Sequence, residues 1–449
     1  MSSLVTSEMN ISLKTSEEQI IAESADVVYC KSPFRNLPNE ILSYIFILGY
    51  SYAFNVFRLR YQGKPPYPLV ISHVCSKWRH VALNMGELWT DVGMSQFGIN
   101  YNHSVFIYKI WVSRAGCYSI NVMLDLTLLP VASDVHKVLQ ETVMPYRVRK
   151  LDITLSHRQL SQLSNLDLNI EELAITLTDF PGQKDFIAPP FLSQARYIFF
   201  RNTYWQEFDV PSATLYVLWH ELRVLKCACG VALSSWLDVL RQAPLLEKCD
   251  LIICSVGTDR LEAVTLPNLR SFAIGLREVH PDTVVPFISA PKITTLEIES
   301  LDAWSADTYN ITKRQYKLNR LQRLKLHPTR KFPLHVIEVL KDASMIQDLF
   351  LGGRPILNDE TREKIVGGQL GRSLTQLTFH GCEDDAKEWL DVVEARQKNV
   401  CALLQTVTNW QEMFTGLRRV GFSDVKNSEA YRERVAALEL LGVEVKFNV

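Results

Sequence analysis

A short alternating pattern returns along most of the chain, and it constrains the fold more than any other feature of the sequence. Segments of about eight residues, in which apolar side chains alternate with polar ones as in a half-buried strand, begin at residues 149, 171, 195, 222, 246, 269, 293, 321, 346, 374 and 417. Helical or turn segments such as "SSWLDVLRQAP" and "FPLHVIEVLKDA" lie between them. One strand and one helix cannot bury their own apolar faces, so these units must stack on one another as a solenoid.

This pattern resembles an irregular leucine-rich repeat, because most starts are about 22 to 28 residues apart. The asparagine or cysteine that regularly follows the strand in that family is mostly missing here. The resemblance implies a curved α/β solenoid over residues 93–449 that holds a target protein by its inner strand face or its rim loops. The segment "CEDDAKEWLDVVEARQKNVCALLQTVTNWQEMF" predicts a long helix near the end of the chain, which we interpret as a terminal cap.

Length and composition limit the classes of protein to consider. A chain of 449 residues is expected to form two or more units. With 22% charged residues and a formal charge of −1, it offers no electrostatic case for nucleic acid or an anionic membrane. Residues 1–33 are predicted to be a flexible leader without the pattern of a signal peptide. Nine cysteines, an odd number, favour reduced thiols and a cytoplasmic or nuclear location.

An uncharged stretch between Glu40 and Arg58 has three possible explanations: a membrane anchor, a core helix, or a surface that another protein covers. It barely reaches the roughly 17 residues that a membrane span needs, and it contains several polar residues. We therefore divide it into a helix that starts at Leu37-Pro38 and stops at Gly49, and an inserted loop over about residues 50–68. A second helix is predicted within "PLVISHVCSKWRHVALNMGELW".

These two helical segments resemble an F-box of the type common in fungal proteins. The residues that carry the resemblance are Leu37, Pro38, Glu40, Ile41, Ile45, Phe46, Val74, Cys75, Trp78, Leu88 and Trp89. The sequence departs from the family's pattern in the long insertion and in Gly86-Glu87, where a proline often precedes Leu-Trp. The resemblance implies an all-helical F-box at residues 34–92 that docks on the Skp-type adaptor, and through it on a cullin scaffold.

Two sets of candidate site residues follow. The resemblance assigns adaptor binding to Leu37, Pro38, Glu40, Ile41, Ile45, Phe46, Val74, Cys75 and Trp78. For Phe46 and Trp78 the alternative is packing inside the helical unit, whereas we favour adaptor contact for Leu37, Pro38 and Ile41. Tyr204, Trp205 and Trp219 are candidate target anchors, because aromatic residues are favoured at interface hot spots. Packing in the core or rim is the alternative for these three.

Sequence motifs for chemistry are weak. Cys227, Cys229, Cys249 and Cys254 fall on neighbouring predicted strands, but their spacing fits a zinc site poorly, and we interpret them as buried free thiols. The segment "GGQLGRS" from Gly367 differs from a phosphate-binding loop in length, in Arg372 and in following a helix. His73 and His80 are expected on a solvated helix face. We therefore expect no catalytic residue, no cofactor and no metal.

The sequence predicts a mixed α/β protein that joins a small helical F-box to an irregular leucine-rich-repeat-like solenoid. The function predicted from the two resemblances is that of a non-enzymatic substrate receptor in a Skp–cullin–F-box ubiquitin ligase. Two alternatives stay open: a leucine-rich-repeat scaffold for protein interactions outside the ubiquitin system, and an enzyme that depends on a metal or a nucleotide.

Overall fold

The chain forms two compact units in the computed structural model. The structure describes residues 36–57, 66–94, 97–127, 129, 132–161, 163, 168–179, 194–202, 207–208, 219–257, 260–300, 304, 306–328, 333–380, 383–406, 415–423 and 428–448. Unit 1 comprises Met1–Thr90 and Trp111–Tyr118, and unit 2 comprises Asp91–Ile110 and Ser119–Val449. The leader predicted at residues 1–33 lies outside the described residues. The boundary predicted at residue 92 falls close to Thr90, but unit 1 also takes a later segment that the sequence did not indicate.

Unit 1 is helical. It contains α2 (Asn39–Phe57), α3 (Tyr67–Ser72), α4 (Ser76–Asn84) and the 3-10 helix η2 (Gly86–Trp89), and it takes the last turn of α5 (Phe97–Ala115). Its core is built from the large apolar side chains Leu42, Phe46, Ile71, Val81, Leu88 and Trp89. The indole of Trp89 donates a hydrogen bond to the Ala82 carbonyl at 2.8 Å and packs edge-on against Trp111, with ring centroids 4.6 Å apart.

The helix stop predicted at Gly49 is wrong. Helix α2 continues through Gly49 to Phe57, so the first part of the predicted loop is helical; residues 58–65 lie outside the described residues. A Cβ at position 49 would overlap the ring and hydroxyl of Tyr67. Gly49 therefore serves the close approach of α3 to α2 and not the end of a helix.

The second predicted helix is interrupted. Helix α3 ends at Ser72, and α4 begins after Cys75. Cys75 has an extended backbone and caps the new helix, because its Sγ accepts from the Trp78 amide at 3.5 Å. The apolar residues of this segment are thereby divided between buried and exposed positions. Ile71, Val81 and Ala82 are buried, whereas Val74 and Cys75 are exposed. Among the described residues, no helix has both the length and the apolar character that a membrane span requires.

Unit 2 is built around a long parallel sheet. Its described residues form a 15-stranded sheet in which neighbouring strands follow one another in chain order. The exception is the short strand β6, which pairs only with β7 and does not lie between β5 and β7. The strands are β1 (Asp91–Met94), β2 (Ile120–Asp125), β3 (Val148–Leu155), β4 (Glu172–Leu177), β5 (Tyr197–Asn202), β6 (Glu207–Phe208), β7 (Val224–Ala232), β8 (Lys248–Ser255), β10 (Ser271–Leu276), β12 (Thr295–Ser300), β13 (Arg323–His327), β15 (Asp348–Leu351), β17 (Gln376–His380), β18 (Arg419–Ser423) and β19 (Glu444–Asn448). Every strand that the repeat pattern predicted is present. The coarse prediction of a mixed α/β fold is confirmed, and the long parallel sheet, which is not closed into a barrel, is compatible with a solenoid.

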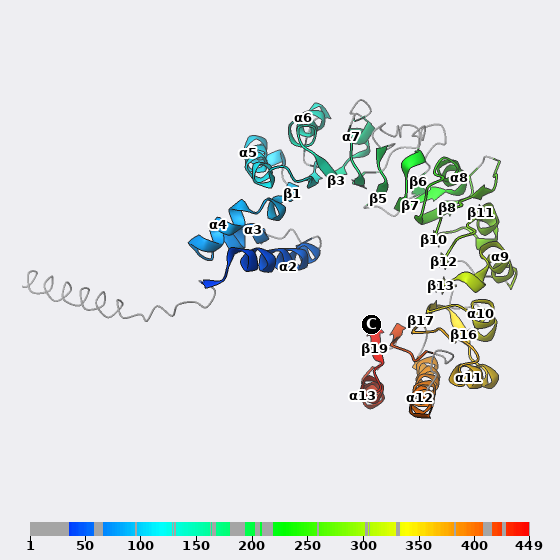
Figure 1. Ribbon diagram of the computed structural model, residues 1–449. Coiled ribbons are helices and arrows are strands. Elements are labelled where there is room, and N and C mark those ends of the chain that lie inside the picture. The colour runs from blue at the N-terminus through cyan, green and yellow to red at the C-terminus, as the bar shows by residue number, and fades with distance from the viewer. Residues whose placement is uncertain are drawn as a thin grey trace, which may run out of the picture. The chain divides into compact units, whose positions relative to one another are not determined.

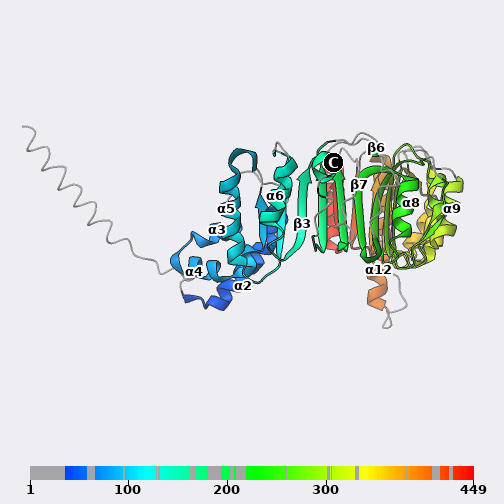
Figure 2. The same cartoon turned by 90° about the horizontal axis from the view of Figure 1, so that it is seen from above.

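Helices and short connections lie on the outer side of this sheet, and the strands lie on the inner side (Figure 1). Figure 2 shows the strands side by side from a second direction. The outer elements are α6 (Ala132–Thr142), α7 (His157–Ser161), η5 (Trp219–Glu221), α8 (Leu233–Arg241), η6 (Pro281–Thr283), η7 (Val285–Phe287), α9 (Ala306–Tyr316), η8 (Leu318–Arg320), α10 (Val336–Asp342), α11 (Asp359–Val366), α12 (Glu383–Thr406), η10 (Ser428–Tyr431) and α13 (Arg432–Leu440). Two small parallel pairs, β9 (Val264–Thr265) with β11 (Ile288–Ser289) and β14 (Pro333–His335) with β16 (Arg354–Ile356), connect neighbouring repeats.

The core of unit 2 is a ladder of apolar side chains between sheet and helices. The register aligns one buried residue of each strand with one of the next, in the series Leu251, Ile274, Ile298, Leu326, Leu351, Phe379 and Phe422. Phe379 stacks on Trp389 of α12 with centroids 3.8 Å apart, so this buried face is the one that the helices cover. Most of the alternate residues of these strands are half-exposed, and they form the inner face.

The predicted C-terminal helix is confirmed as α12, and Trp389, Val392, Val393 and Val400 are buried on it. The same helix also buries Arg396 completely. Its guanidinium donates to the carbonyls of Ile365 at 2.8 Å, Gly371 at 2.8 Å and Thr415 at 2.9 Å. Burial lowers the pKa of Arg396 to about 10, and the carbonyl groups supply the hydrogen bonds that a buried cation requires.

Candidate partner-binding surfaces

An apolar stripe faces outward on α2. Ile41, Tyr44, Ile45 and Leu48 are 47%, 62%, 38% and 54% exposed. Their spacing of three and four residues places them on one side of the helix, and we call this set the α2 surface. A row of four large apolar side chains on one helix is unusual on a surface that only water covers, and such rows are typical of helices that dock on a partner.

The opposite side of α2 fixes this helix in unit 1. Leu42 and Phe46 are fully buried, and the Phe46 ring packs edge-on against Trp78 of α4 with centroids 5.0 Å apart. The α2 surface is therefore presented by a helix whose inner face is held by packing. Residues of the helix that point outward do not have to move for a partner to reach them.

The segment that leads into α2 is also held in place. The Lys77 ammonium of α4 donates a hydrogen bond to the Leu37 carbonyl at 2.5 Å. The Leu42 amide donates to the Pro38 carbonyl at 3.1 Å, which is the first hydrogen bond of the helix. Leu37 is half-buried and Pro38 is exposed. The chain segment at Leu37 and Pro38, directly before the α2 surface, is thus held in one conformation by hydrogen bonds.

The structure divides the nine residues that the F-box resemblance assigned to adaptor binding. Those with exposed side chains are Pro38, Glu40, Ile41, Ile45, Val74 and Cys75, and those that are half-buried are Leu37 and Trp78. Phe46 is completely buried. Assignment of Phe46 to direct partner contact is therefore incorrect for this conformation, since the ring fills the space between α2 and α4 and supports the surface from beneath.

Four exposed large hydrophobic residues of unit 1, among those that the structure describes, were absent from the prediction: Tyr44, Leu48, Val70 and Tyr118. Tyr44 and Leu48 lie three and seven residues after Ile41, so the helical period alone would have placed them beside it. They were missed because the whole apolar stretch was treated as one broad face. The structure shows two faces, of which one is buried and one is exposed.

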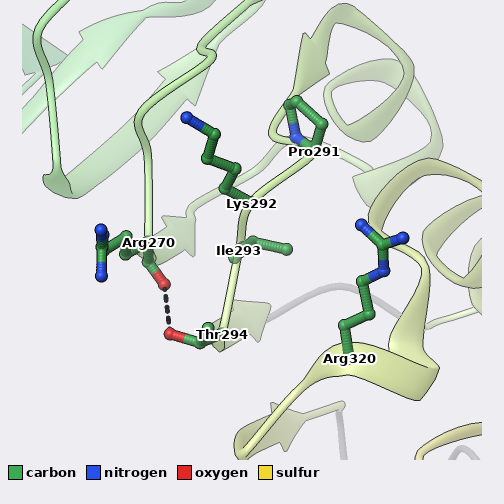
Figure 3. Close-up of a pocket in the computed structure, with 6 residues that line it drawn as sticks. All are labelled: Arg270, Pro291, Lys292, Ile293, Thr294 and Arg320. Atoms are coloured by element: carbon green, nitrogen blue, oxygen red, sulfur yellow. Dashed lines mark hydrogen bonds between the residues drawn. The ribbon is translucent and has the colours of Figure 1, made fainter.

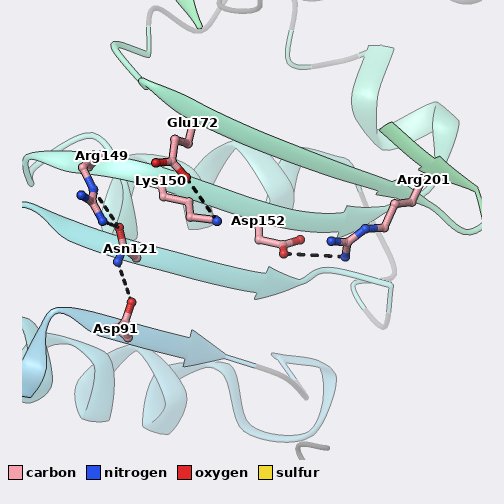
Figure 4. Close-up of polar contacts among 7 residues, drawn as sticks. All are labelled: Asp91, Asn121, Arg149, Lys150, Asp152, Glu172 and Arg201. Atoms are coloured by element: carbon pink, nitrogen blue, oxygen red, sulfur yellow. Dashed lines mark hydrogen bonds and ion pairs between the residues drawn. The ribbon is translucent and has the colours of Figure 1, made fainter. Parts of the chain in front are cut away.

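The inner face of unit 2 is a polar surface that extends over many strands. Side chains on adjacent strands, and in one case on strands two apart, are joined across it, as Figure 4 shows for the first strands of the sheet. The pairs there are Asp91–Asn121 at 2.6 Å, Lys150–Glu172 at 3.3 Å and Asp152–Arg201 at 3.9 Å. Half-exposed ion pairs of this kind each add little stability, but together they hold the polar side chains in defined positions.

Arg201 shows how this inner face is organised. Its guanidinium lies over the ring of Phe199 at 4.2 Å and reaches from β5 past β4 to Asp152 on β3. On β4, the register position between Asp152 and Phe199 is held by Ala174. Its short side chain leaves room for the Arg201 side chain to cross β4. Two aromatic side chains on this part of the face, the exposed Tyr197 and the half-exposed Phe199, were not singled out by the sequence reasoning.

Of the three predicted target anchors, Tyr204 and Trp205 lie outside the described residues. Trp219 is only 2% exposed, so its prediction as an exposed anchor is wrong. It lies in η5, where its carbonyl accepts from the Leu222 amide at 3.1 Å directly before β7 begins. The indole is part of the core, which was the alternative for this residue.

The residues with possible chemistry have structural roles. Cys227, Cys229, Cys249 and Cys254 are buried free thiols on β7 and β8, as predicted, and burial raises the pKa of Cys227 and of Cys249. Within the described residues, no group of three or more His, Cys, Asp or Glu side chains is arranged to hold a metal ion. His73 and His80 are exposed, as expected.

The "GGQLGRS" segment begins at the C-terminal end of α11 and turns its carbonyl groups toward Arg396. A phosphate-binding loop requires the opposite arrangement, because backbone N–H groups must point at the anion. The carbonyls of Ile365 and Gly371 instead surround a cation. This segment therefore organises the core around α12.

No family model matches the chain, and no curated protein matches it. The F-box and leucine-rich-repeat resemblances accordingly rest on the residues quoted above.

Proposed function

We propose that the chain is a substrate receptor that binds the Skp-type adaptor of a Skp–cullin–F-box ubiquitin ligase through unit 1 and a target protein through unit 2. The observation that carries the proposal is the α2 surface, where Ile41, Tyr44, Ile45 and Leu48 are exposed on a helix whose other side is firmly packed. These positions include two of the residues that make the sequence resemble an F-box.

The energetics of docking fit such a surface. A few large apolar side chains supply most of the binding energy in helix-mediated contacts, and a helix already held in place loses little conformational entropy when it binds. Ubiquitin transfer would be performed by other subunits, so the contribution of this chain would be proximity and orientation of the target.

Unit 2 is suited to the second contact. Its inner face offers many polar groups in fixed positions together with an exposed aromatic ring at Tyr197 and a half-exposed one at Phe199, a combination typical of surfaces that recognise proteins. A repeat architecture spreads such groups over an extended area.

Capture of a purified Skp-type adaptor by the full chain tests the proposal. Ile41→Asp combined with Leu48→Asp is expected to reduce capture at least tenfold, because two charges would have to be buried in the contact. Leu440→Asp is the matched control, since Leu440 is an exposed leucine of unit 2 (89% exposed) that lies outside the α2 surface.

Failure of the wild-type chain to capture the adaptor would overturn the ligase assignment, and so would normal capture by the double variant. If the chain still retained a protein partner through unit 2, the scaffold function outside the ubiquitin system would take its place.

A further inference from the structure

Among the described residues, strand β19 of the unit 2 sheet has a neighbour on one side only, namely β18 (Figure 1). Interior strands are paired on both sides. Where β12 begins, the Thr294 amide donates to the Arg270 carbonyl of the preceding repeat at 2.9 Å, and the Thr294 carbonyl accepts from the Gln322 amide of the following repeat at 2.8 Å. Figure 3 shows the first of these junctions, where the Thr294 hydroxyl also donates to the Arg270 carbonyl, at 3.1 Å.

The backbone of β19 determines which residues face the open edge. The Glu444 amide donates to the Arg418 carbonyl at 2.9 Å, so Glu444 directs its backbone groups toward β18. Successive residues of a strand direct their N–H and C=O groups to opposite sides. Val445 and Phe447 therefore direct theirs to the open edge, where such groups can pair with a strand of another chain.

The apolar side chains of β19 are incompletely covered as well. In the register, Val445 lies beside Val420 of β18, and Phe447 lies beside Phe422. Val420 and Phe422 are 0% and 2% exposed, whereas Val445 and Phe447 are half-exposed. The Phe447 ring stacks on Phe422 with centroids 5.4 Å apart, so its position is fixed although it is not buried. A further strand beside β19 would cover both the backbone groups and these side chains.

On its other face, β19 carries two exposed charges of opposite sign. Glu444 and Lys446 are two residues apart, and the Glu444 carboxylate pairs with the Lys446 ammonium at 2.9 Å and with Arg419 of β18 at 2.7 Å. A lysine alone on an edge strand discourages pairing with another chain. A lysine that follows a glutamate instead favours a partner strand on which the two charges occur in the reverse order.

A second copy of β19 provides this order. When two β19 strands pair antiparallel about a two-fold axis beside Val445, Glu444 of each copy lies opposite Lys446 of the other. Val445 then lies opposite Val445, and the two residues exchange two N–H···O=C hydrogen bonds. Val443 lies opposite Phe447, so apolar side chains meet on one face while four charges alternate in sign on the other. An axis beside Lys446 would place two lysines opposite each other, which is unfavourable.

We propose that β19 is the interface of a homodimer, in which the unit 2 sheets of two copies pair antiparallel about Val445. The inner faces of the two copies then lie on the same side of the joined sheet. This assembly goes beyond the proposed function, because it requires neither the adaptor nor a target. The contact is short, so the dimer is expected to be weak.

Analytical ultracentrifugation of the full chain tests the proposal at concentrations up to about 100 µM, a range suited to a weak interface. Wild type is expected to show a concentration-dependent equilibrium between monomer and dimer. Lys446→Glu gives the edge two acidic residues, and Glu444→Lys gives it two basic ones. Each variant alone should raise the Kd of the dimer about tenfold, because like charges then lie opposite each other twice.

An equimolar mixture of the two variants restores opposite charges at both positions, so it should form a heterodimer about as readily as wild type forms its dimer. A loss of folding in either variant would not produce this rescue. Lys398→Glu is the matched control: it changes the net charge as Lys446→Glu does, but at an exposed lysine of α12, and it should dimerise like wild type.

A wild-type chain that stays monomeric over the whole concentration range would overturn the proposal. Undiminished dimerisation of both single variants would also overturn it, and this is the result expected if two copies associate through the α2 surface. The same conclusion would follow if the mixture associated no better than each variant alone. Species larger than a dimer would likewise contradict the proposal, since an interface with a two-fold axis closes after two copies.

Discussion

At the scale of single residues, neighbouring side chains of α2 have opposite roles. Ile41 is exposed and Leu42 is fully buried; Ile45 is exposed and Phe46 is fully buried. Two apolar residues that are adjacent in the sequence lie about 100° apart around a helix, so one faces α4 while the other faces outward. Substitutions at adjacent positions should therefore separate stability from partner binding.

Phe46→Ala is expected to lower the free energy of unfolding of unit 1 by about 3 to 5 kcal/mol, because a fully buried ring is removed and its contact with Trp78 is lost. Tyr44→Ala, at the most exposed position of the α2 surface, should change it by about 0.5 kcal/mol or less. Hydrogen exchange of the α2 amides in the full chain measures both effects. Equal exchange rates in the two variants would contradict the division of α2 into two faces.

His327 provides a residue-scale prediction about pH. Its ring stacks on Phe350 with centroids 4.1 Å apart. Burial lowers the pKa of His327 below its ordinary value; nearby Lys325 and His380 act in the same direction, and Glu297 and Glu299 oppose them. The unfolded chain therefore binds a proton at a higher pH than the folded chain does, and stability is lost as the pH falls through the ordinary histidine range, about 6.5.

His327→Asn should consequently reduce the loss of thermal stability between pH 7.5 and pH 5.5. The difference between wild type and variant isolates this residue from the other titrating groups. An equal loss of melting temperature in both proteins would show that His327 does not titrate at a lowered pKa.

At the scale of helices and strands, the sequence predicted the elements that carry a sustained period. The strands of the repeat were recognisable because apolar residues alternate over five or more positions. Strands β6, β9, β11, β14 and β16 are two or three residues long, too short for a period to be distinguished from chance. Their pairing depends on neighbours that are distant in the sequence.

The candidate surface was predictable only in part for the same reason. The apolar character of α2 was evident, but the choice of the covered face depends on α3, α4 and η2, which follow later in the chain. Arg396 is a stronger example. An arginine on a helix is expected at the surface, and the carbonyls that make its burial possible come from residues 365–371 and from Thr415.

Gly49 gives a prediction at the scale of elements. Glycine to alanine inside a helix normally stabilises by roughly 1 kcal/mol. Here the added Cβ would overlap Tyr67 at the start of α3, so Gly49→Ala is expected to destabilise unit 1. In a Tyr67→Ala background the same substitution should become stabilising, because the obstacle has been removed.

Thermal denaturation of wild type, Gly49→Ala, Tyr67→Ala and the double variant measures the coupling between positions 49 and 67. A stabilising effect of Gly49→Ala in both backgrounds would mean that α2 and α3 do not require the close approach.

At the scale of the whole molecule, the compact units are not continuous in the sequence. Residues 111–118 belong to unit 1, although the segment from Asp91 to Ile110 belongs to unit 2. These late residues contact η2 directly. Besides the Trp89–Trp111 contact, the Arg114 guanidinium lies over the Trp89 ring at 4.4 Å, and the Tyr118 hydroxyl donates to Glu87 at 3.2 Å. A helical unit of this size has little other apolar surface to bury.

A fragment of residues 34–92, which corresponds to the F-box as the sequence delimits it, is therefore expected to be poorly folded. A fragment of residues 34–118 should melt cooperatively at a higher temperature and capture the Skp-type adaptor, because it restores the packing around Trp89. Circular dichroism and adaptor capture measure the two properties.

Trp111→Ala in the longer fragment is the matched control: it leaves the chain length unchanged and should remove much of the gain in melting temperature. If residues 34–92 alone melt as cooperatively and at the same temperature as the longer fragment, the segment from Trp111 to Tyr118 is dispensable and unit 1 ends where the sequence pattern ends.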